Sequence, residues 1–231
     1  MADATPALHV ENLSKTYGKG QSAFHALKNI SLTIEKGDSV AILGKSGSGK
    51  STLMHLLALL DAPSKGQVSI DGVNMATLRS RRIDMLRNSQ FGFVFQQFFL
   101  NANASVLENI ILPLKIAGVP NKERINRAHQ VLQLVDLFDK AKNKAKDLSG
   151  GQKQRVVIAR ALINKPKIIF ADEPTGNLDS TTGAKIEELL FKLNKEQGIT
   201  LVIVTHDPEL AKRCTRRIEI KDGAIVKEMQ S

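Results

Sequence analysis

The chain has 231 residues, of which 42% are hydrophobic and 24% are charged, a composition typical of a globular protein with a substantial buried core. Its apolar runs, such as 40–43 and 168–171, are far shorter than the roughly 20 residues that cross a bilayer, and the segment 1–7 lacks a signal-peptide pattern, so we expect an intracellular protein. The formal net charge of +10 favours polyanions, namely nucleotide phosphates, nucleic acid or an anionic membrane face.

The content of cysteine and aromatic residues indicates the redox compartment and bears on nucleic-acid binding. The single cysteine, Cys214, cannot form an internal disulfide and has no Cys or His cluster near it in sequence, so we interpret it as a bystander in a reducing compartment. Tyr17 is the only tyrosine and tryptophan is absent, so stacking platforms for single-stranded nucleic acid are scarce and no nucleic-acid partner is expected. The sequence has two basic clusters, one of Arg79, Arg81, Arg82 and Arg87 and one of Lys140, Lys142, Lys144 and Lys146. We interpret each cluster as a solvated face, and the alternative for each is a contact with a polyanion.

Short strands and longer helices alternate along most of the chain. Continuous apolar runs predict strands that are covered on both faces, as in a largely parallel sheet. These runs are 38–43, 91–95, 168–171 and 200–204. Apolar residues at helical spacing predict helices over 50–60, 122–135, 150–164 and 182–197. This alternation indicates an α/β architecture.

The ends of the chain and its middle depart from this alternation. Antiparallel strands and hairpins are predicted over 8–13, 24–34, 67–70 and 217–226, which indicates an added β-layer. The segment 101–147 carries helical patterns without a convincing strand, so we interpret it as a helical insertion. We expect one domain over 1–231, with a core of about 1–95 and 156–231 and a helical subdomain of about 96–155.

A glycine-rich segment between a predicted strand and a predicted helix indicates phosphate binding. It matches the pattern GxxxxGK followed by Ser or Thr, which is typical of a loop whose backbone N–H groups surround phosphate oxygens at a helix N-terminus. Lys50 is expected to reach the β- and γ-phosphates, and Ser51 to ligate Mg²⁺. The predicted nucleotide-binding residues of this segment are Gly44, Lys45, Ser46, Gly47, Ser48, Gly49, Lys50, Ser51 and Thr52.

Two acids follow the apolar run that ends at Ala171. Carboxylates at the C-terminal end of a buried parallel strand lie where open α/β sheets bind ligands. Alone, such a pair usually marks only the exit of a strand to solvent. Beside a phosphate loop, it indicates nucleotide hydrolysis, with Asp172 on the metal side and Glu173 as the general base for the attacking water.

A second segment is suited to anion binding. Ser149 can cap the helix that follows, and two glycines let a phosphate approach the backbone. The alternative is an ordinary capped helix after a turn. The predicted nucleotide contacts here are Ser149, Gly150, Gly151 and Gln152.

Together, these segments resemble the ATP-binding cassette (ABC) ATPase family of P-loop NTPases. The resemblance rests on LSGGQ followed by Gln-Arg and Ala-Arg-Ala-Leu, and on IIFADEPTGNLD, and it extends over nearly the whole chain. It implies a core with a mostly parallel sheet, an antiparallel β-layer and a helical subdomain insertion. It also implies a head-to-tail homodimer, in which the phosphate loop of one copy and the LSGGQ segment of the other close on the same Mg-ATP.

The resemblance assigns roles to further residues. Tyr17 matches the aromatic residue that stacks on adenine, His206 matches the histidine that contacts the γ-phosphate, and Asn177 begins a loop that communicates between subunits. The implied Mg²⁺ ligands are Ser51, Gln96 and Asp172. The implied catalytic residues are Lys50, Gln96, Glu173 and His206.

The segments 172–179 and 107–110 resemble most closely the LolD/MacB-like subfamily, which serves lipoprotein release, macrolide export and antimicrobial-peptide resistance. This implies a peripheral ATPase on the cytoplasmic face of the cell membrane that drives separate permease subunits, in export or in lipoprotein- or peptide-related transport. The candidates for the permease contact are Phe98, Phe99, Leu100 and Leu107, which fill the core of the insertion in the alternative interpretation.

Three other functions are weighed against this one. ATPases of nucleic-acid maintenance usually carry a very long coiled coil between the two halves, and this chain has none. Translation factors of the same superfamily carry two cassettes, and one is present here. A P-loop kinase has no use for LSGGQ or the His206 segment. The sequence leaves the transported substrate open.

Overall fold

The computed structural model describes residues 5–230, so residues 1–4 and 231 lie outside the described range. Residues 1–4 belong to the segment 1–7, which lacks a signal-peptide pattern. The chain forms two compact units. Unit 1 comprises Met1–Asp84 and Asn194–Ser231, and unit 2 comprises Met85–Leu193. None of the described helices has the length and apolar character needed to cross a membrane. The predicted organisation, one domain with a helical subdomain over about 96–155, stays a prediction.

Unit 1 contains an antiparallel sheet of four strands in the order β2-β1-β4-β5. The strands are β1 (Leu8–Tyr17), β2 (Phe24–Ile34), β4 (Lys65–Ile70) and β5 (Val73–Asn74). Leu8, Val10 and Leu13 of β1 are almost fully buried, while neighbouring residues are partly or fully exposed, so one face of this sheet packs against the core. The added antiparallel layer is therefore confirmed for 8–13, 24–34 and 67–70. The predicted segment 217–226 was wrongly placed in it, because it forms β9 (Arg216–Lys221) and β10 (Ala224–Gln230) beside β3 (Ser39–Leu43).

The second group of strands in unit 1 lies in the order β10-β9-β3-β8. These are β3 (Ser39–Leu43), β8 (Thr200–Val204), β9 (Arg216–Lys221) and β10 (Ala224–Gln230). Strand β3 pairs in parallel with β8 and β9, whereas β9 and β10 form an antiparallel hairpin through Asp222 and Gly223. Every residue of β8 is buried, as its continuous apolar run predicts. The remaining elements of unit 1 are η1 (Gly20–Ser22), α1 (Lys50–Leu57), η2 (Met75–Thr77) and α8 (Pro208–Lys212).

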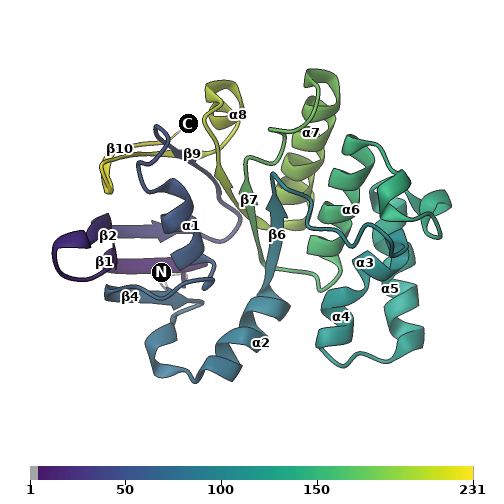
Figure 1. Cartoon of the computed structure of the whole chain (residues 1–231), viewed down its shortest axis with the longest axis horizontal. Helices are drawn as coiled ribbons and strands as arrows, with labels where there is room; N and C mark the ends of the chain where they lie inside the picture. The colour runs from purple at the N-terminus through teal and green to yellow at the C-terminus, as the bar shows by residue number, and fades with distance from the viewer. Residues whose placement is uncertain (1–4, 231) are drawn as a thin grey trace. The chain divides into compact units, whose positions relative to one another are not determined.

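Unit 2 combines one parallel strand pair with helices. Strand β6 (Phe91–Phe95) pairs with β7 (Ile168–Asp172), and the Phe91 and Phe170 rings pack edge to face with centroids 5.2 Å apart. Figure 1 shows helices α3, α4, α5 and α6 clustered together in this unit. The helices are α3 (Val106–Ile110), α4 (Leu112–Ile116), α5 (Asn121–Leu134), η3 (Phe138–Lys140), η4 (Ala145–Asp147), α6 (Gly150–Leu162) and α7 (Ser180–Gln197), of which α7 continues into unit 1 from Asn194. The α/β fold class is confirmed.

Several element boundaries differ from the predictions. The helix expected over 50–60 ends at Leu57, because Leu59 adopts a left-handed backbone with a φ of 56°. Helix α2 (Ser80–Gln90), which spans the boundary between the units, was not predicted, because most of its residues are polar or charged and none of them is buried. It carries Arg81, Arg82 and Arg87 of the predicted basic cluster, and Arg79 directly precedes it.

Candidate functional site

The phosphate loop of unit 1 has a backbone that only glycine can adopt at two positions. Gly44 has a φ of 154°, and a Cβ there would lie 2.3 Å from the Ile220 carbonyl oxygen and 2.5 Å from Ser48 Oγ. Gly49 has a φ of 108°, and a Cβ there would lie 2.7 Å from the Ala26 carbonyl oxygen. The loop therefore packs closely against neighbouring backbone, and no side chain fits at these two positions.

Lys50 folds back into this loop. Its Nζ donates hydrogen bonds to the carbonyl oxygens of Gly44 at 2.8 Å and Lys45 at 3.0 Å. The Ser48 carbonyl oxygen accepts a hydrogen bond from the Gly223 N–H at 3.0 Å, which ties the loop to the β9–β10 turn. The buried Ser48 Oγ has no hydrogen-bond partner among the described residues. An ammonium held within a loop at the N-terminus of α1, with a spare buried hydroxyl, suits a phosphate ligand.

His206 and the phosphate loop follow neighbouring parallel strands. Ile42 of β3 pairs with Val204 of β8, so the loop after Leu43 and the residues after Val204 leave the sheet at the same edge. The Thr205 N–H donates to the Ile42 carbonyl oxygen at 3.2 Å, and the next side chain, His206, is exposed. The strand register thus brings the predicted His206 to the loop edge of unit 1.

Tyr17 ends strand β1 with its side chain 41% exposed. Its hydroxyl donates a hydrogen bond to Asp61 Oδ2 at 2.9 Å, and burial of the phenol together with this bond raises the pKa of Tyr17. A hydrogen bond from Thr52 has the opposite, smaller effect on that pKa, which places Tyr17 beside helix α1. The predicted base contact and the predicted phosphate loop are therefore neighbours in unit 1.

In unit 2, the register of β6 and β7 brings Gln96 and Glu173 to one edge. Phe95 pairs with Asp172, so the residues that follow them leave the strand pair side by side. Glu173 has a φ of 45°, a strained conformation for a residue with a side chain, and the Gly176 N–H donates to its carbonyl oxygen at 3.1 Å. Strain of this kind occurs at functional sites, where the surrounding structure holds it.

The LSGGQ segment forms a complete capping box at the start of α6. The Ser149 Oγ accepts from the Gln152 N–H at 3.3 Å, and the Gln152 side chain accepts from the Ser149 N–H at 3.0 Å. A Cβ on Gly151 would lie 2.3 Å from the Thr182 Cγ2 of α7. The glycine is therefore required for close packing of α6 against α7. The predicted cap by Ser149 is present. The role of this segment as a nucleotide contact stays a prediction.

Three residues that support the site were missed by the sequence analysis. The Arg160 guanidinium donates to the carbonyl oxygens of Phe99 at 2.8 Å and Phe98 at 3.1 Å, and burial lowers its pKa. The buried Gln154 side chain donates to the Pro174 carbonyl oxygen at 2.5 Å, directly after Glu173. Asp61 is the third. For Arg160 and Gln154 the available signal was a polar residue within a run of buried apolar helix positions.

Magnesium prefers oxygen ligands and is commonly held by one or two carboxylates together with substrate phosphates. Within residues 5–230, no group of three or more His, Cys, Asp or Glu side chains gathers as a metal cluster. Asp172 lies half-buried at the end of β7, and Ser51 is an exposed residue in the first turn of α1. Each residue by itself offers an oxygen donor of the type that fits a metal bound mainly through a nucleotide.

Comparisons with known proteins agree with this geometry. The ABC transporter family profile matches residues 27–176. The lipoprotein-releasing system ATP-binding protein LolD of Bordetella pertussis is 46% identical over 224 residues, which cover 96% of each chain. The macrolide export ATP-binding/permease protein MacB of Aggregatibacter actinomycetemcomitans is 47% identical over 223 residues, 96% of this chain. This chain spans only 34% of that relative.

A solved structure is also similar. It is a dimeric ATP-binding cassette in a post-hydrolysis state, bound to ADP and Pi. It is 44% identical in sequence, the TM-score is 0.88, and the match covers 96% of this chain and 98% of the other.

Proposed function

This chain belongs to the ABC transporter family, as an ATP-binding cassette with ATPase activity, and on that premise we propose that it hydrolyses Mg-ATP as a homodimer that drives separate membrane permease subunits. The observation that carries the proposal is the phosphate loop, in which Gly44 and Gly49 admit no Cβ and the Lys50 ammonium lies within hydrogen-bond distance of two loop carbonyls.

Unit 1 binds the nucleotide in this proposal. Lys50 exchanges its bonds to loop carbonyls for bonds to the β- and γ-phosphates, where its positive charge counters the charge of the transition state. The first N–H groups of α1 point at the same phosphates. Tyr17 stacks on the base, and His206 donates a hydrogen bond to the γ-phosphate.

Unit 2 supplies the groups that act on water. Glu173 accepts a proton from the attacking water as general base, and Gln96 orients that water. Mg²⁺, when bound, neutralises charge on the phosphate oxygens. Ser51, Gln96 and Asp172 would hold it, since each offers an oxygen donor of the type that Mg²⁺ prefers.

The dimer completes each site. Ser149, Gly150, Gly151 and Gln152 of one copy contact the nucleotide held by the phosphate loop of the other copy, in a head-to-tail arrangement. The similarity to a dimeric cassette bound to ADP and Pi supports this proposal. A symmetric pair of sites also agrees with the preference of soluble homo-oligomers for twofold symmetry.

The permease proposal draws on the relatives. One is named for lipoprotein release, and another combines an ATP-binding part with a permease in one longer protein. We therefore assign this chain to a transporter of the LolD/MacB-like subfamily, as a peripheral subunit on the cytoplasmic face of the cell membrane. Phe99 is the most exposed of the four predicted contact residues, with 65% of its side chain accessible.

Phosphate release from Mg-ATP without any acceptor tests the proposed function. We expect the wild-type protein to hydrolyse ATP with no stimulation by DNA or RNA, which separates it from kinases and nucleic-acid motors. Glu173→Gln is expected to lower the rate by about 100-fold or more while nucleotide binding persists, so that an ATP-bound dimer accumulates in size-exclusion chromatography. The exposed Glu188 of α7 provides the control variant Glu188→Gln, which keeps the wild-type rate. Hydrolysis at the wild-type rate by Glu173→Gln would remove Glu173 from its role.

A further inference from the structure

Lys15, Tyr17 and Asp61 form a connected cluster of side chains in unit 1. The Tyr17 hydroxyl donates to Asp61 Oδ2 at 2.9 Å, and the Lys15 Nζ donates to Asp61 Oδ1 at 2.7 Å. The same Lys15 Nζ donates to the Ala62 carbonyl oxygen at 2.7 Å. Both oxygens of the Asp61 carboxylate therefore have partners, and one of them is the phenol of Tyr17.

Lys15 also lies against the Tyr17 ring. Residues 15 and 17 are two apart in strand β1, which puts their side chains on the same face. The Lys15 Nζ is 4.9 Å from the ring centroid, within the range of a cation–π contact. The Lys15 side chain is only 11% exposed, whereas Tyr17 is 41% exposed. The ammonium therefore occupies a sheltered side of the ring and leaves a large part of the ring open to a ligand.

Asp61 is itself fixed to helix α1, which begins at the phosphate loop. The N–H groups of Leu60 and Asp61 both donate to the carbonyl oxygen of His55 in the last turn of that helix, at 2.8 and 3.3 Å. The cluster therefore connects the Tyr17 ring to the same helix that carries Lys50 and Ser51. A single rigid element links the ring and the phosphate loop.

We propose that Asp61 and Lys15 are positioning residues that hold the Tyr17 ring, before any nucleotide arrives, as a stacking surface at a fixed distance from the phosphate loop. This inference rests on the proposed function, in which Tyr17 contacts the base. A side chain held in its bound orientation loses little conformational entropy on binding, so preorganisation raises affinity. Because every base has a π-face, the effect applies to nucleoside triphosphates in general and requires a base.

Calorimetry with two ligands separates the base contact from the phosphate contact. We expect Asp61→Asn and Lys15→Met to weaken Mg-ATP binding about fivefold, since stacking on an aromatic side chain contributes this much or more per base. Binding of Mg-tripolyphosphate, which has no base, should change by less than about twofold. Tyr17→Leu should show the same pattern more strongly. In steady-state kinetics, the rise in KM should exceed any fall in kcat.

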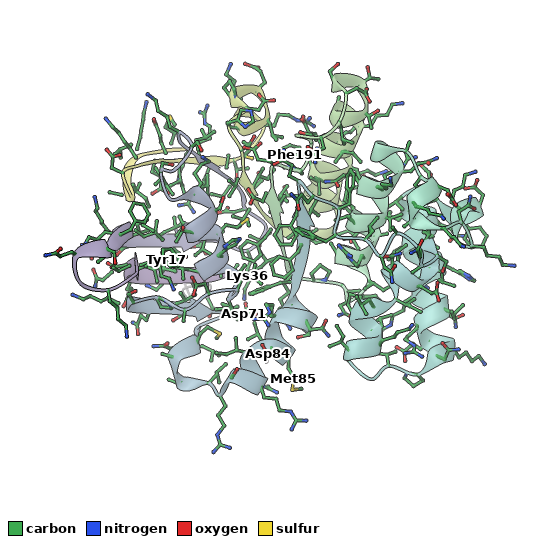
Figure 2. The ribbon with its side chains drawn as sticks, viewed as in Figure 1. Tyr17, Lys36, Asp71, Asp84, Met85 and Phe191 are labelled. Carbon is green, nitrogen blue, oxygen red and sulfur yellow. The ribbon has the colours of Figure 1, made fainter. Side chains whose placement is uncertain are left out.

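The chain offers a matched control. Lys36 and Asp71 form another ion pair in unit 1, with the Lys36 Nζ 3.1 Å from Asp71 Oδ1. The Asp71 side chain is 29% exposed, against 30% for Asp61, and Figure 2 marks Tyr17 together with this control pair. Asp71→Asn removes the same charge from a similar environment, so we expect it to bind both ligands like the wild type.

Tyr17 also provides a direct spectroscopic readout. It is the only tyrosine in a chain without tryptophan, so the tyrosinate absorption band reports on Tyr17 alone. Burial and the hydrogen bond to Asp61 raise the pKa of Tyr17, and the negative charge of Asp61 acts in the same direction. Asp61→Asn should therefore lower the pH at which the tyrosinate band develops, while Asp71→Asn should not. A purely structural role for Asp61 would not produce this shift together with selective loss of ATP binding.

The outcomes are distinguishable. Wild-type ATP affinity in both Asp61→Asn and Lys15→Met, while Tyr17→Leu binds ATP weakly, would overturn the inference and leave the proposed function intact. Equal weakening of ATP and tripolyphosphate would also overturn it, since the variants would then act on the phosphate loop. Failure of the wild-type protein to bind either ligand would contradict the proposed function, and the inference with it.

Discussion

Gln96 and Asn177 hold each other through two hydrogen bonds in unit 2. The Gln96 Nε2 donates to Asn177 Oδ1 at 3.3 Å, and the Asn177 Nδ2 donates to the Gln96 main-chain oxygen at 2.8 Å. Gly176 lies against this pair, because a Cβ there would lie 2.9 Å from the Gln96 Nε2 and would require the Gln96 side chain to shift. The pair joins the residue that orients water in the proposed mechanism to the loop that follows the proposed base.

Asn177→Ala removes both of these hydrogen bonds. We expect kcat to fall about tenfold, because a misplaced positioning group weakens transition-state stabilisation more than binding. The dissociation constant for ATP, measured by calorimetry, should stay close to that of the wild type. Asn126→Ala, on the exposed surface of α5, is the control. Loss of ATP binding in Asn177→Ala, or an unchanged kcat, would show that this pair does not act through Gln96.

Two glycines of the phosphate loop should respond differently to alanine. Gly44→Ala places a Cβ 2.3 Å from the Ile220 carbonyl oxygen, so the loop must move, and we expect ATP affinity to fall by more than about tenfold. Gly47→Ala meets nothing within 4 Å, so only its φ of 77° is unfavourable, at a cost of about 1 kcal/mol. Calorimetry and thermal unfolding of both variants test this order. Equal effects would mean that contact with Ile220 does not shape the loop.

Arg160→Met should destabilise the segment after Gln96. The substitution leaves the carbonyl oxygens of Phe98 and Phe99 without their charged donor, and Phe99 is held at a φ of 44°. We expect a melting temperature lower by roughly 5 to 10 °C, from the loss of about 3 kcal/mol in two hydrogen bonds to a charged group. Lys185→Met, on the exposed face of α7, controls for loss of a positive charge. Equal melting temperatures for the two variants would contradict the proposed support by Arg160.

Mixing two inactive variants tests whether the sites are shared between copies. Lys50→Ala and Ser149→Arg each damage both sites of their own homodimer, but a heterodimer of the two has one intact site. An equal mixture should therefore recover roughly a quarter of the wild-type hydrolysis rate if partners exchange at random. The recovered hydrolysis rate is measured as phosphate release from ATP at several mixing ratios.

Ser105→Arg is the control for this experiment. Ser105 caps α3 in the same type of capping box as Ser149, so its replacement removes an equivalent cap. Ser105→Arg alone should keep hydrolysis, unlike Ser149→Arg. No recovery in the original mixture, once heterodimers are shown to form, would argue against a shared site.

Phe99→Asp should separate ATP binding from permease binding. The ring is exposed, so we expect the variant to fold and to bind ATP, but to be lost from membranes that contain the permease. Co-sedimentation with such membranes at low and high salt is the measurement, because an apolar contact should resist salt. Phe138→Asp, at another exposed phenylalanine of unit 2, is the control. Membrane association equal to that of the wild type would place the permease contact elsewhere.

The amino-acid sequence alone determined the elements whose signal is local. The phosphate loop is a contiguous pattern, and the continuous apolar runs at 91–95 and 200–204 match β6 and β8 residue for residue. The cap at Ser149 needs only Gln152, three positions away. Such features are predictable, because the interacting groups are neighbours in the chain or follow a fixed period.

Only the tertiary structure decided which distant residues support these elements. Asp61 lies 44 positions from Tyr17, and Arg160 lies 61 positions from Phe99, yet each pair is joined by a hydrogen bond. Neither pair has a periodic or local signature. Helix α2 was not predicted either, since most of its residues are polar or charged and none of them is buried. Contacts of this kind depend on how sheets and helices bring separated segments together, which no local pattern of side chains encodes.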